Sequence, residues 1–126
     1  MRVFKTRSFA RFTRQEAFGD GALANAVRQM EAGLIDADLG GGLIKLRLAR
    51  PGAGKRGGYR TLIAYKAGER AVFLFGFAKN ERENISADQL ADLKAVAGDI
   101  LSRSEQELAA GIVEGRLQEV DYGRED

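Results

Sequence analysis

The sequence predicts an α+β domain with a small antiparallel sheet of about four strands, mixed at its edge. Two N-terminal helices are expected on one face of the sheet. A further helix is expected near the C-terminus. Three observations lead to this class: helical spacing of apolar residues near both ends of the chain, a basic strand in the middle, and an apolar hairpin after it. A length of 126 residues, 44% of them hydrophobic, suffices for one domain with a single small core.

The N-terminal third is expected to form one strand and two helices. Residues 2–6 are rich in β-formers and predict a short strand. Ser8 is expected to cap a short helix with one apolar face. Asp20 is expected to cap a second helix, in which apolar residues recur at three and four positions and Gly33 supplies the stop. Both helices should share one apolar face.

A basic strand follows a glycine-rich loop. Residues 43–48 alternate apolar side chains with Lys45 and Arg47, so one side of this strand should be buried and the other basic. Residues 51–58 hold four glycines and one proline. Because such a composition weakens a strand, this segment is expected to be a loop.

Residues 59–65 and 71–77 are near-continuous apolar runs, which predicts a hairpin in the middle of the sheet. If its loop has four residues, Lys66 pairs with Ala71, and this register places Arg60 opposite Phe77. Lys79 is then a diagonal neighbour of Arg60 on the same face, about 7–8 Å away. Two cations at this separation suit one phosphate, unless both are merely solvated or paired with glutamates.

A third helix is expected from Ser86, because Ser86-Ala87-Asp88-Gln89 has the pattern of a capping box. This helix is the expected cover for the apolar residues that share the Arg60 face of the hairpin. Those residues are Leu62, Ala64, Phe73 and Phe75.

Charge is divided unevenly along the chain. Residues 43–82 hold ten Lys or Arg against two Glu, whereas residues 83–126 hold four Lys or Arg against eleven acidic residues. Such a basic block predicts a phosphate-bearing partner. The domain is expected to span residues 1–102, and residues 103–126 to form an acidic C-terminal helix or flexible tail. This tail either folds over the basic block or is a solvated terminus.

Several classes of site are excluded by composition. The chain has no Cys and no His, which excludes disulfides, thiolate chemistry, zinc sites and Ser-His-Asp triads. No metal and no cofactor is expected. No apolar run reaches the roughly 18 residues that span a bilayer, and the N-terminus lacks the pattern of a signal peptide. A cytoplasmic location is therefore expected.

Residues 52–57 spell the pattern G-x-G-x-x-G, but they do not predict a nucleotide site. The dinucleotide fingerprint must open a helix, whereas a strand follows here. A P-loop needs Ser or Thr where this chain has Arg56. Lys55 and Arg56 nevertheless suit the phosphates of a nucleic-acid backbone.

The predicted order of elements is strand–helix–helix–three strands–helix, and three local features of the sequence accompany it. They are the basic strand, Gly58-Tyr59-Arg60 at the start of the next strand, and Lys79-Asn80-Glu81-Arg82 after the last one. Together they resemble the RelE/ParE superfamily of bacterial type II toxins, and most closely its RelE-like and HigB-like members. Some of these also have a Gly-Lys-Arg-Gly-Gly loop like residues 54–58. The resemblance covers residues 1–102.

The resemblance implies a RelE-like fold and a ribosome-dependent mRNA endonuclease, in which a 2′-hydroxyl attacks the adjacent phosphate without metal or histidine. It implies that Arg60 stabilises the added negative charge and that Lys79 shares this charge or helps in proton transfer. The expected RNA-binding residues are Lys45, Arg47, Lys55, Arg56 and Arg82.

The general base stays open. Asn80 stands in place of the arginine of the best-known RelE pattern, and the tyrosine of that pattern is also missing. The available substitutes are Tyr59, Tyr65 and Glu81. Both tyrosines should face away from Arg60 and pack in the core, so Glu81 is the preferred candidate.

Two other functions stay open. A ParE-like toxin that inhibits DNA gyrase without cutting RNA has the same fold. A plain RNA-binding module would need exposed aromatic residues for base stacking, and few are expected here. For either toxin, the resemblance implies a cognate antitoxin of helix-turn-helix or acidic type as partner, with mRNA on the ribosome as the substrate of the nuclease.

Overall fold

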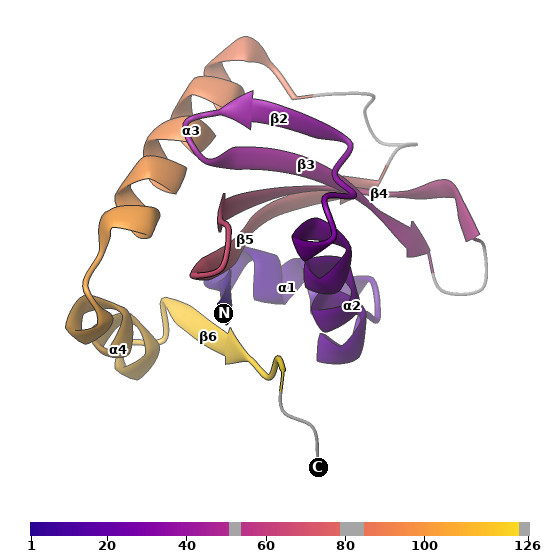
Figure 1. Ribbon diagram of the computed structural model, residues 1–126. Helices are drawn as coiled ribbons and strands as arrows, with labels where there is room; N and C mark the ends of the chain where they lie inside the picture. Colours follow the sequence, from indigo (N-terminus) through magenta and orange to yellow (C-terminus); the bar gives the residue numbers. More distant parts are fainter. Residues whose placement is uncertain (51–53, 79–84, 124–126) are drawn as a thin grey trace.

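The structure is a computed structural model that describes residues 1–50, 54–78 and 85–123. Its strands are β1 (Arg2–Thr6), β2 (Ala37–Gly40), β3 (Leu43–Arg50), β4 (Gly54–Lys66), β5 (Arg70–Ala78) and β6 (Leu117–Val120). They form one mixed sheet in the order β2-β3-β4-β5-β1-β6 (Figure 1). β1 runs parallel to β5, and the other neighbours are antiparallel.

Helices cover both faces of this sheet. They are α1 (Arg7–Gln15), α2 (Asp20–Glu31), α3 (Ala87–Ser102) and α4 (Glu105–Val113). Apolar residues of α1 and α2 join the core on one face, and those of α3 and α4 join a second core on the other (Figure 1). The α+β class and the placement of the N-terminal helices are confirmed. The described sheet has six strands instead of about four, because β2 and β6 extend its two edges.

The helices begin at capping residues, although not always at the predicted one. Ser86 caps α3 and forms the predicted capping box. α1 is capped by the hydroxyl of Thr6, which ends β1, so Ser8 already lies in the first turn. Asp20 is the first residue of α2, and the extended residue before it is Gly19. A carboxylate in the first turn still stabilises the N-terminus of a helix.

The β4–β5 hairpin has the predicted pairing at Arg60 but not at its loop. Arg60 lies opposite Phe77, whereas Lys66 pairs with Arg70, so the loop is one residue shorter than predicted. The register shifts between Leu62 and Ile63, where β5 contributes one more residue than β4. This bulge compensates for the shorter loop.

The bulge also changes which side chains share a face. Leu62, Ala64 and Phe75 belong to the core beneath α3 and α4, as predicted for the Arg60 face. Phe73 does not, because its ring lies 5.1 Å from the ring of Phe9 on the opposite face. One additional residue in a strand reverses the side of every side chain beyond it.

The predicted loop at residues 51–58 is wrong in part, because Gly54 to Gly58 form the start of β4. Arg50 pairs with Gly54 and Leu48 with Tyr59, and the register between these pairs is irregular. Glycines are tolerated in a strand at such irregularities. The number of glycines was therefore a poor guide to where β4 begins.

The acidic segment after Ser102 is folded through most of its length. Glu105–Val113 form a helix, one of the two forms expected, and β6 then pairs with β1. β6 was not predicted, because its buried residues stand first and last in a four-residue strand and do not alternate.

Within this segment, β6 lies away from the cations of β3 and β4, since β5 and β1 separate it from β4. Glu105 and Glu119 both pair with Arg2 of β1. Glu105 also pairs with Arg70 of the basic block (3.6 Å), whereas no described carboxylate of the tail pairs with Lys45, Arg47 or Arg60. The described contacts of the tail with the basic block are thus confined to the hairpin end, and the hypothesis that the tail weakens RNA binding stays a prediction. Among the helices that the structure describes, none is long and apolar enough to cross a membrane.

Gly42 in the β2–β3 turn offers a test of how the turn meets α3. Its φ is +84°, and a Cβ there would lie 2.5 Å from Cδ1 of Leu101. A left-handed backbone costs an L-residue about 1–2 kcal/mol, and Leu101 would also have to move. We expect Gly42→Ala to lower the free energy of unfolding by about 1–3 kcal/mol in urea denaturation.

Gly98→Ala is the matched control for this substitution. Gly98 is an exposed residue within α3, and a Cβ there meets open space. Because alanine favours a helix more than glycine does, this variant should gain up to about 1 kcal/mol. Similar changes in both variants would contradict the importance of the turn.

Candidate functional site

Cationic side chains lie together on the α3 side of β3 and β4. Arg47 of β3 is opposite Arg60 of β4, and Arg60 is in turn opposite Phe77 of β5. Lys45 is opposite Leu62, a buried residue of the core beneath α3. Because side chains alternate along a strand, Lys45 and Arg47 share one face with Arg60. We call Lys45, Arg47 and Arg60 the cationic row.

The cationic row is accessible to solvent. Arg47 is exposed, and Lys45 and Arg60 are partly exposed. The C-terminal part of α3 covers the other end of this face, near the hairpin turns, where Arg70 Nη1 donates to the carbonyl of Ile100 (2.8 Å). Directly opposite residues of antiparallel strands have Cα atoms about 4.5–5.5 Å apart, so the guanidinium groups of Arg47 and Arg60 can reach one ligand.

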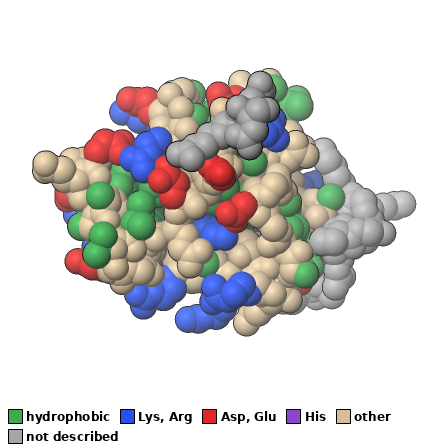
Figure 2. All heavy atoms as spheres, turned by 90° about the horizontal axis from the view of Figure 1, so that it is seen from below, with side chains coloured by type: hydrophobic (Ala, Val, Ile, Leu, Met, Phe, Trp, Pro, Cys, Tyr) green, Lys and Arg blue, Asp and Glu red, His purple; other side chains and the backbone are tan. Residues whose placement is uncertain are grey.

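The cationic row is not neutralised by the carboxylates that the structure describes. Among the residues that the structure describes, no carboxylate forms an ion pair with Lys45, Arg47 or Arg60. Several cations elsewhere are paired, as in Lys5 with Asp20 (2.8 Å). On the face seen in Figure 2, acidic and basic side chains lie beside one another. Like charges directly opposite one another destabilise a sheet, so the row has no evident structural benefit.

Asp36 is a supporting residue that the sequence analysis missed. Its Oδ2 accepts a hydrogen bond from the backbone N–H of Arg47 (2.6 Å), and its own N–H donates to the carbonyl of Lys45 (3.0 Å). These bonds hold the edge of β3 where its pairing with β2 ends. An aspartate before a glycine-rich turn is a weak signal in the sequence, because its partner lies eleven residues away.

The remaining predicted site residues are described in part or not at all. Lys79, Glu81 and Arg82 lie outside the described residues, and so does the expected approach of Lys79 to Arg60. The backbone of Lys55 and Arg56 belongs to β4, whereas their side chains lie outside the described part. The roles of these five residues stay predictions.

Tyr59 and Tyr65 lie in the core on the face opposite Arg60. The Tyr59 ring meets that of Phe12 edge-on at 5.4 Å, and its hydroxyl donates to Oε1 of Glu16 (2.5 Å). Burial, with a smaller effect of a nearby glutamate, raises the pKa of Tyr65. Their positions fit the packing role that was the alternative to a general base.

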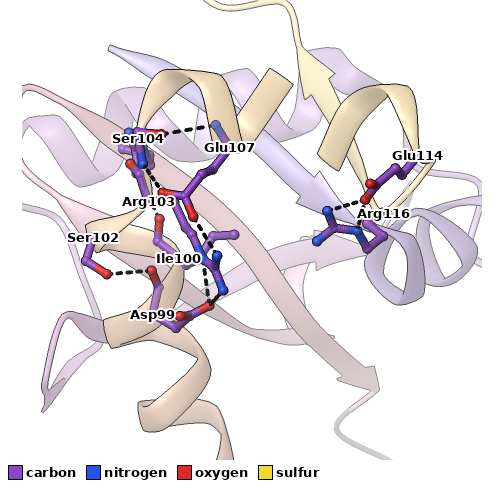
Figure 3. Close-up of polar contacts among 9 residues, drawn as sticks. Asp99, Ile100, Ser102, Arg103, Ser104, Glu107, Glu114 and Arg116 are labelled. Atoms are coloured by element: carbon purple, nitrogen blue, oxygen red, sulfur yellow. Dashed lines mark hydrogen bonds and ion pairs between the residues drawn. The ribbon is translucent and has the colours of Figure 1, made fainter. Parts of the chain in front are cut away.

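A second polar cluster joins α3 to α4 (Figure 3). Arg103 donates to Oδ2 of Asp99 through Nε (3.2 Å) and Nη2 (3.0 Å), and to Oε2 of Glu107 through Nη1 (2.7 Å). Ser104 caps α4 and forms a capping box with Glu107. A cavity of about 380 Å³ lies beside this cluster. Because Arg103 is neutralised by two carboxylates, the cluster holds the two helices and does not offer charge to an anion.

Residues 1–120 match the model of the RelE toxin of the RelE/RelB toxin–antitoxin system. The chain belongs to the RelE toxin family. The predicted resemblance is thereby confirmed, and the match continues past residue 102 through α4 and β6. No curated protein matches the sequence significantly. Membership in the RelE family makes the chain the toxin of a toxin–antitoxin system, with a cognate antitoxin as its partner.

The neighbouring like charges of Arg47 and Arg60 in this RelE-family toxin lead to a stability prediction. Because Arg47 and Arg60 repel each other, we expect Arg47→Gln to leave the free energy of unfolding unchanged or to raise it by up to about 1 kcal/mol. Arg2→Gln, which removes a paired cation, should lower it by up to about 1 kcal/mol. Urea denaturation of both variants measures the difference, and a larger loss for Arg47→Gln would contradict the repulsion.

A second prediction concerns the α4 cap. The backbone N–H of Ser104 and then Arg103 hold the pKa of Glu107 below its ordinary value. Its carboxylate therefore contributes to stability fully above about pH 4.3, and this contribution is lost as the pH falls through the lowered pKa. A ¹³C NMR titration should show Glu107 titrating below that pH. Arg103→Gln should move the titration upward, and an unmoved midpoint would contradict the contribution of Arg103.

Proposed function

We propose that this toxin is a ribosome-dependent mRNA endonuclease whose cationic row holds the phosphates of the mRNA. The row itself supports this proposal: three accessible cations on adjacent strands, with no carboxylate paired to them in the described part of the chain. Sequences depart from stabilising patterns mainly at functional sites. A phosphate ligand explains why like charges are kept together here.

The proposed reaction is a transesterification. The 2′-oxygen of one nucleotide attacks the adjacent phosphorus and loses its proton to a base, and the bond from phosphorus to the 5′-oxygen breaks. The products are a 2′,3′-cyclic phosphate and a 5′-hydroxyl that has gained a proton. Negative charge accumulates on the non-bridging oxygens in the transition state, where a fixed cation is most effective.

Arg60 is the residue that we assign to the transition state. A guanidinium can donate two parallel hydrogen bonds to a phosphate. Arg60 lies between Arg47 and Phe77 in the register of three strands, which places it inside the sheet and not at its rim. Lys45 and Arg47 would bind flanking phosphates.

The sequence supplies the remaining assignments. Lys79 would share the charge or help in proton transfer, and Glu81 would act as the general base, since carboxylates serve this role where histidine is missing. Lys55, Arg56 and Arg82 would hold the RNA backbone. The antitoxin would be of acidic or helix-turn-helix type, and translating ribosomes place the proposed activity in the cytoplasm.

Cleavage is tested by incubating the purified toxin with translating ribosomes and mapping mRNA 5′ ends. We expect Arg60→Ala to lower the cleavage rate by roughly 10²-fold or more, the usual effect of removing one donor that stabilises the transition state. Arg116→Ala is the control, because Arg116 is an exposed cation beside β6 that pairs with Glu114. Intact mRNA with trapped DNA gyrase would instead support the ParE-like function. If the protein neither cleaves mRNA nor traps gyrase, the plain RNA-binding module is the remaining function.

Salt dependence tests the role of the row in binding. Each phosphate contact to a single strand contributes about −0.7 to the slope of log K against log salt. We expect Lys45→Gln to weaken binding of an uncleavable RNA and to reduce that slope by about 0.7 in fluorescence anisotropy. Lys66→Gln serves as the control, because Lys66 is paired with Glu69 at the hairpin loop. Equal slopes for the wild type and Lys45→Gln would contradict a phosphate contact.

A further inference from the structure

A cavity lies next to the cationic row, at the edge of β5. β1 pairs with β5 as far as Phe73, and α1 begins directly after β1. Beyond Phe73 the edge of β5 therefore faces a helix and not another strand. A space of about 260 Å³ remains between them. Its lining includes Ser8, Arg11, Phe12 and Gln15 from α1, and Phe75 and Phe77 from β5.

Phe77 connects this cavity to the cationic row. It lines the cavity and is also the register partner of Arg60. Neighbouring strands lie about 4.8 Å apart, so the cavity begins one strand away from Arg60. A single-stranded nucleic acid with a phosphate at Arg60 would bring a neighbouring base to the edge of β5.

The walls of the cavity are aromatic. The rings of Phe75 and Phe77 have centroids 5.9 Å apart; Phe75 is partly buried, whereas Phe77 is buried, with 3% of its surface exposed. The ring of Phe12 lies against Gly76, where a Cβ would come within 2.6 Å of it. Bases of single-stranded RNA stack on exposed aromatic rings, so the partly exposed Phe75 is the ring of this cavity that suits a base. The volume is below the roughly 300–1,000 Å³ of pockets for drug-sized ligands, which suits one flat ring system.

The rim of the cavity is polar and carries unpaired positive charge. Arg11 and Gln15 are exposed, and in the described part of the chain no carboxylate pairs with Arg11. Glu16 also lines the cavity, but its Oε1 accepts the hydrogen bond of the buried Tyr59 hydroxyl. Arg11 is thus placed to bind a phosphate next to a stacked base, and Gln15 to hydrogen-bond a base edge.

We propose that this cavity is a subsite for the RNA base next to the scissile phosphate, with Arg11 binding the adjoining phosphate. The inference rests on the proposed function, because it takes RNA as the ligand of the cationic row. Stacking at the cavity would hold the strand so that the scissile phosphate stays at Arg60. The subsite would therefore position the substrate, while the chemistry belongs to the row.

The test is an NMR titration of the full-length ¹⁵N-labelled toxin with a 2′-O-methylated RNA trinucleotide, which cannot be cleaved. We expect the amides of Arg11, Gln15 and Phe75 to shift together with that of Arg60. Two otherwise identical trinucleotides each lack one terminal base, the 5′ base in one and the 3′ base in the other. One of these two should bind roughly tenfold more weakly than the intact trinucleotide. That oligonucleotide should no longer shift the cavity amides.

Arg11→Gln and Arg14→Gln form a matched pair of variants. Both remove an exposed cation from α1, but only Arg11 lines the cavity. We expect Arg11→Gln to weaken trinucleotide binding about three- to tenfold and Arg14→Gln to weaken it less than twofold. Gln15→Glu should weaken binding by repulsion, and unchanged thermal unfolding of all three variants would show that the fold is intact.

The outcomes separate this inference from the proposed function. If Arg60 responds to RNA and mRNA is cleaved while the cavity amides stay unmoved, the subsite is overturned and the nuclease stands. Equal effects of Arg11→Gln and Arg14→Gln, or equal affinities for the intact and both shortened RNAs, also overturn the subsite. If neither Arg60 nor the cavity responds and mRNA stays intact, both proposals are wrong.

Discussion

The pairing of β4 with β3 and β5 is the constraint on which the rest of the structure depends. β4 is the longest described strand, and its two neighbours bury it along most of its length. Its alternation sends Tyr59 and Ile63 into the core under α1 and α2, and Leu62 and Ala64 into the core under α3. The same alternation places Arg60 on the α3 side. A shift of this register by one residue would exchange both cores and bury the arginine.

Two kinds of cation follow from this arrangement. Those at the β1–β6 edge are neutralised within the fold, as in the contacts of Arg2 with Glu105 and Glu119. Lys45, Arg47 and Arg60 on β3 and β4 lack such partners in the described residues, although the C-terminal segment is rich in carboxylates. The docking of β6 on β1 explains this difference, because it directs the acidic segment to the far side of the sheet. Within the described residues, the fold therefore neutralises one set of cations and not the other.

The placement of the candidate residues on β3 could be predicted where local patterns were decisive. Lys45 and Arg47 alternate with apolar residues, so their shared exposed side could be predicted without knowledge of the fold. The pairing of Arg60 with Phe77 was predicted from a loop of the wrong length. The loop is shorter by one residue, and the bulge adds one to β5, so the two errors cancel at Arg60. They do not cancel at Phe73, which lies before the bulge and faces the other core.

Sequence alone determined the α+β class, the central hairpin, the capping box at Ser86 and the basic side of β3. Each depends on residues within a few positions of one another, whose spacing follows from helix and strand geometry. Tertiary structure alone decided the bulge in β5, the addition of β6 to β1, and the partners of Arg2 and Asp36. These depend on backbone and side-chain groups brought together by the folded sheet. An isolated segment does not specify which of several possible partners will satisfy its hydrogen bonds and charges.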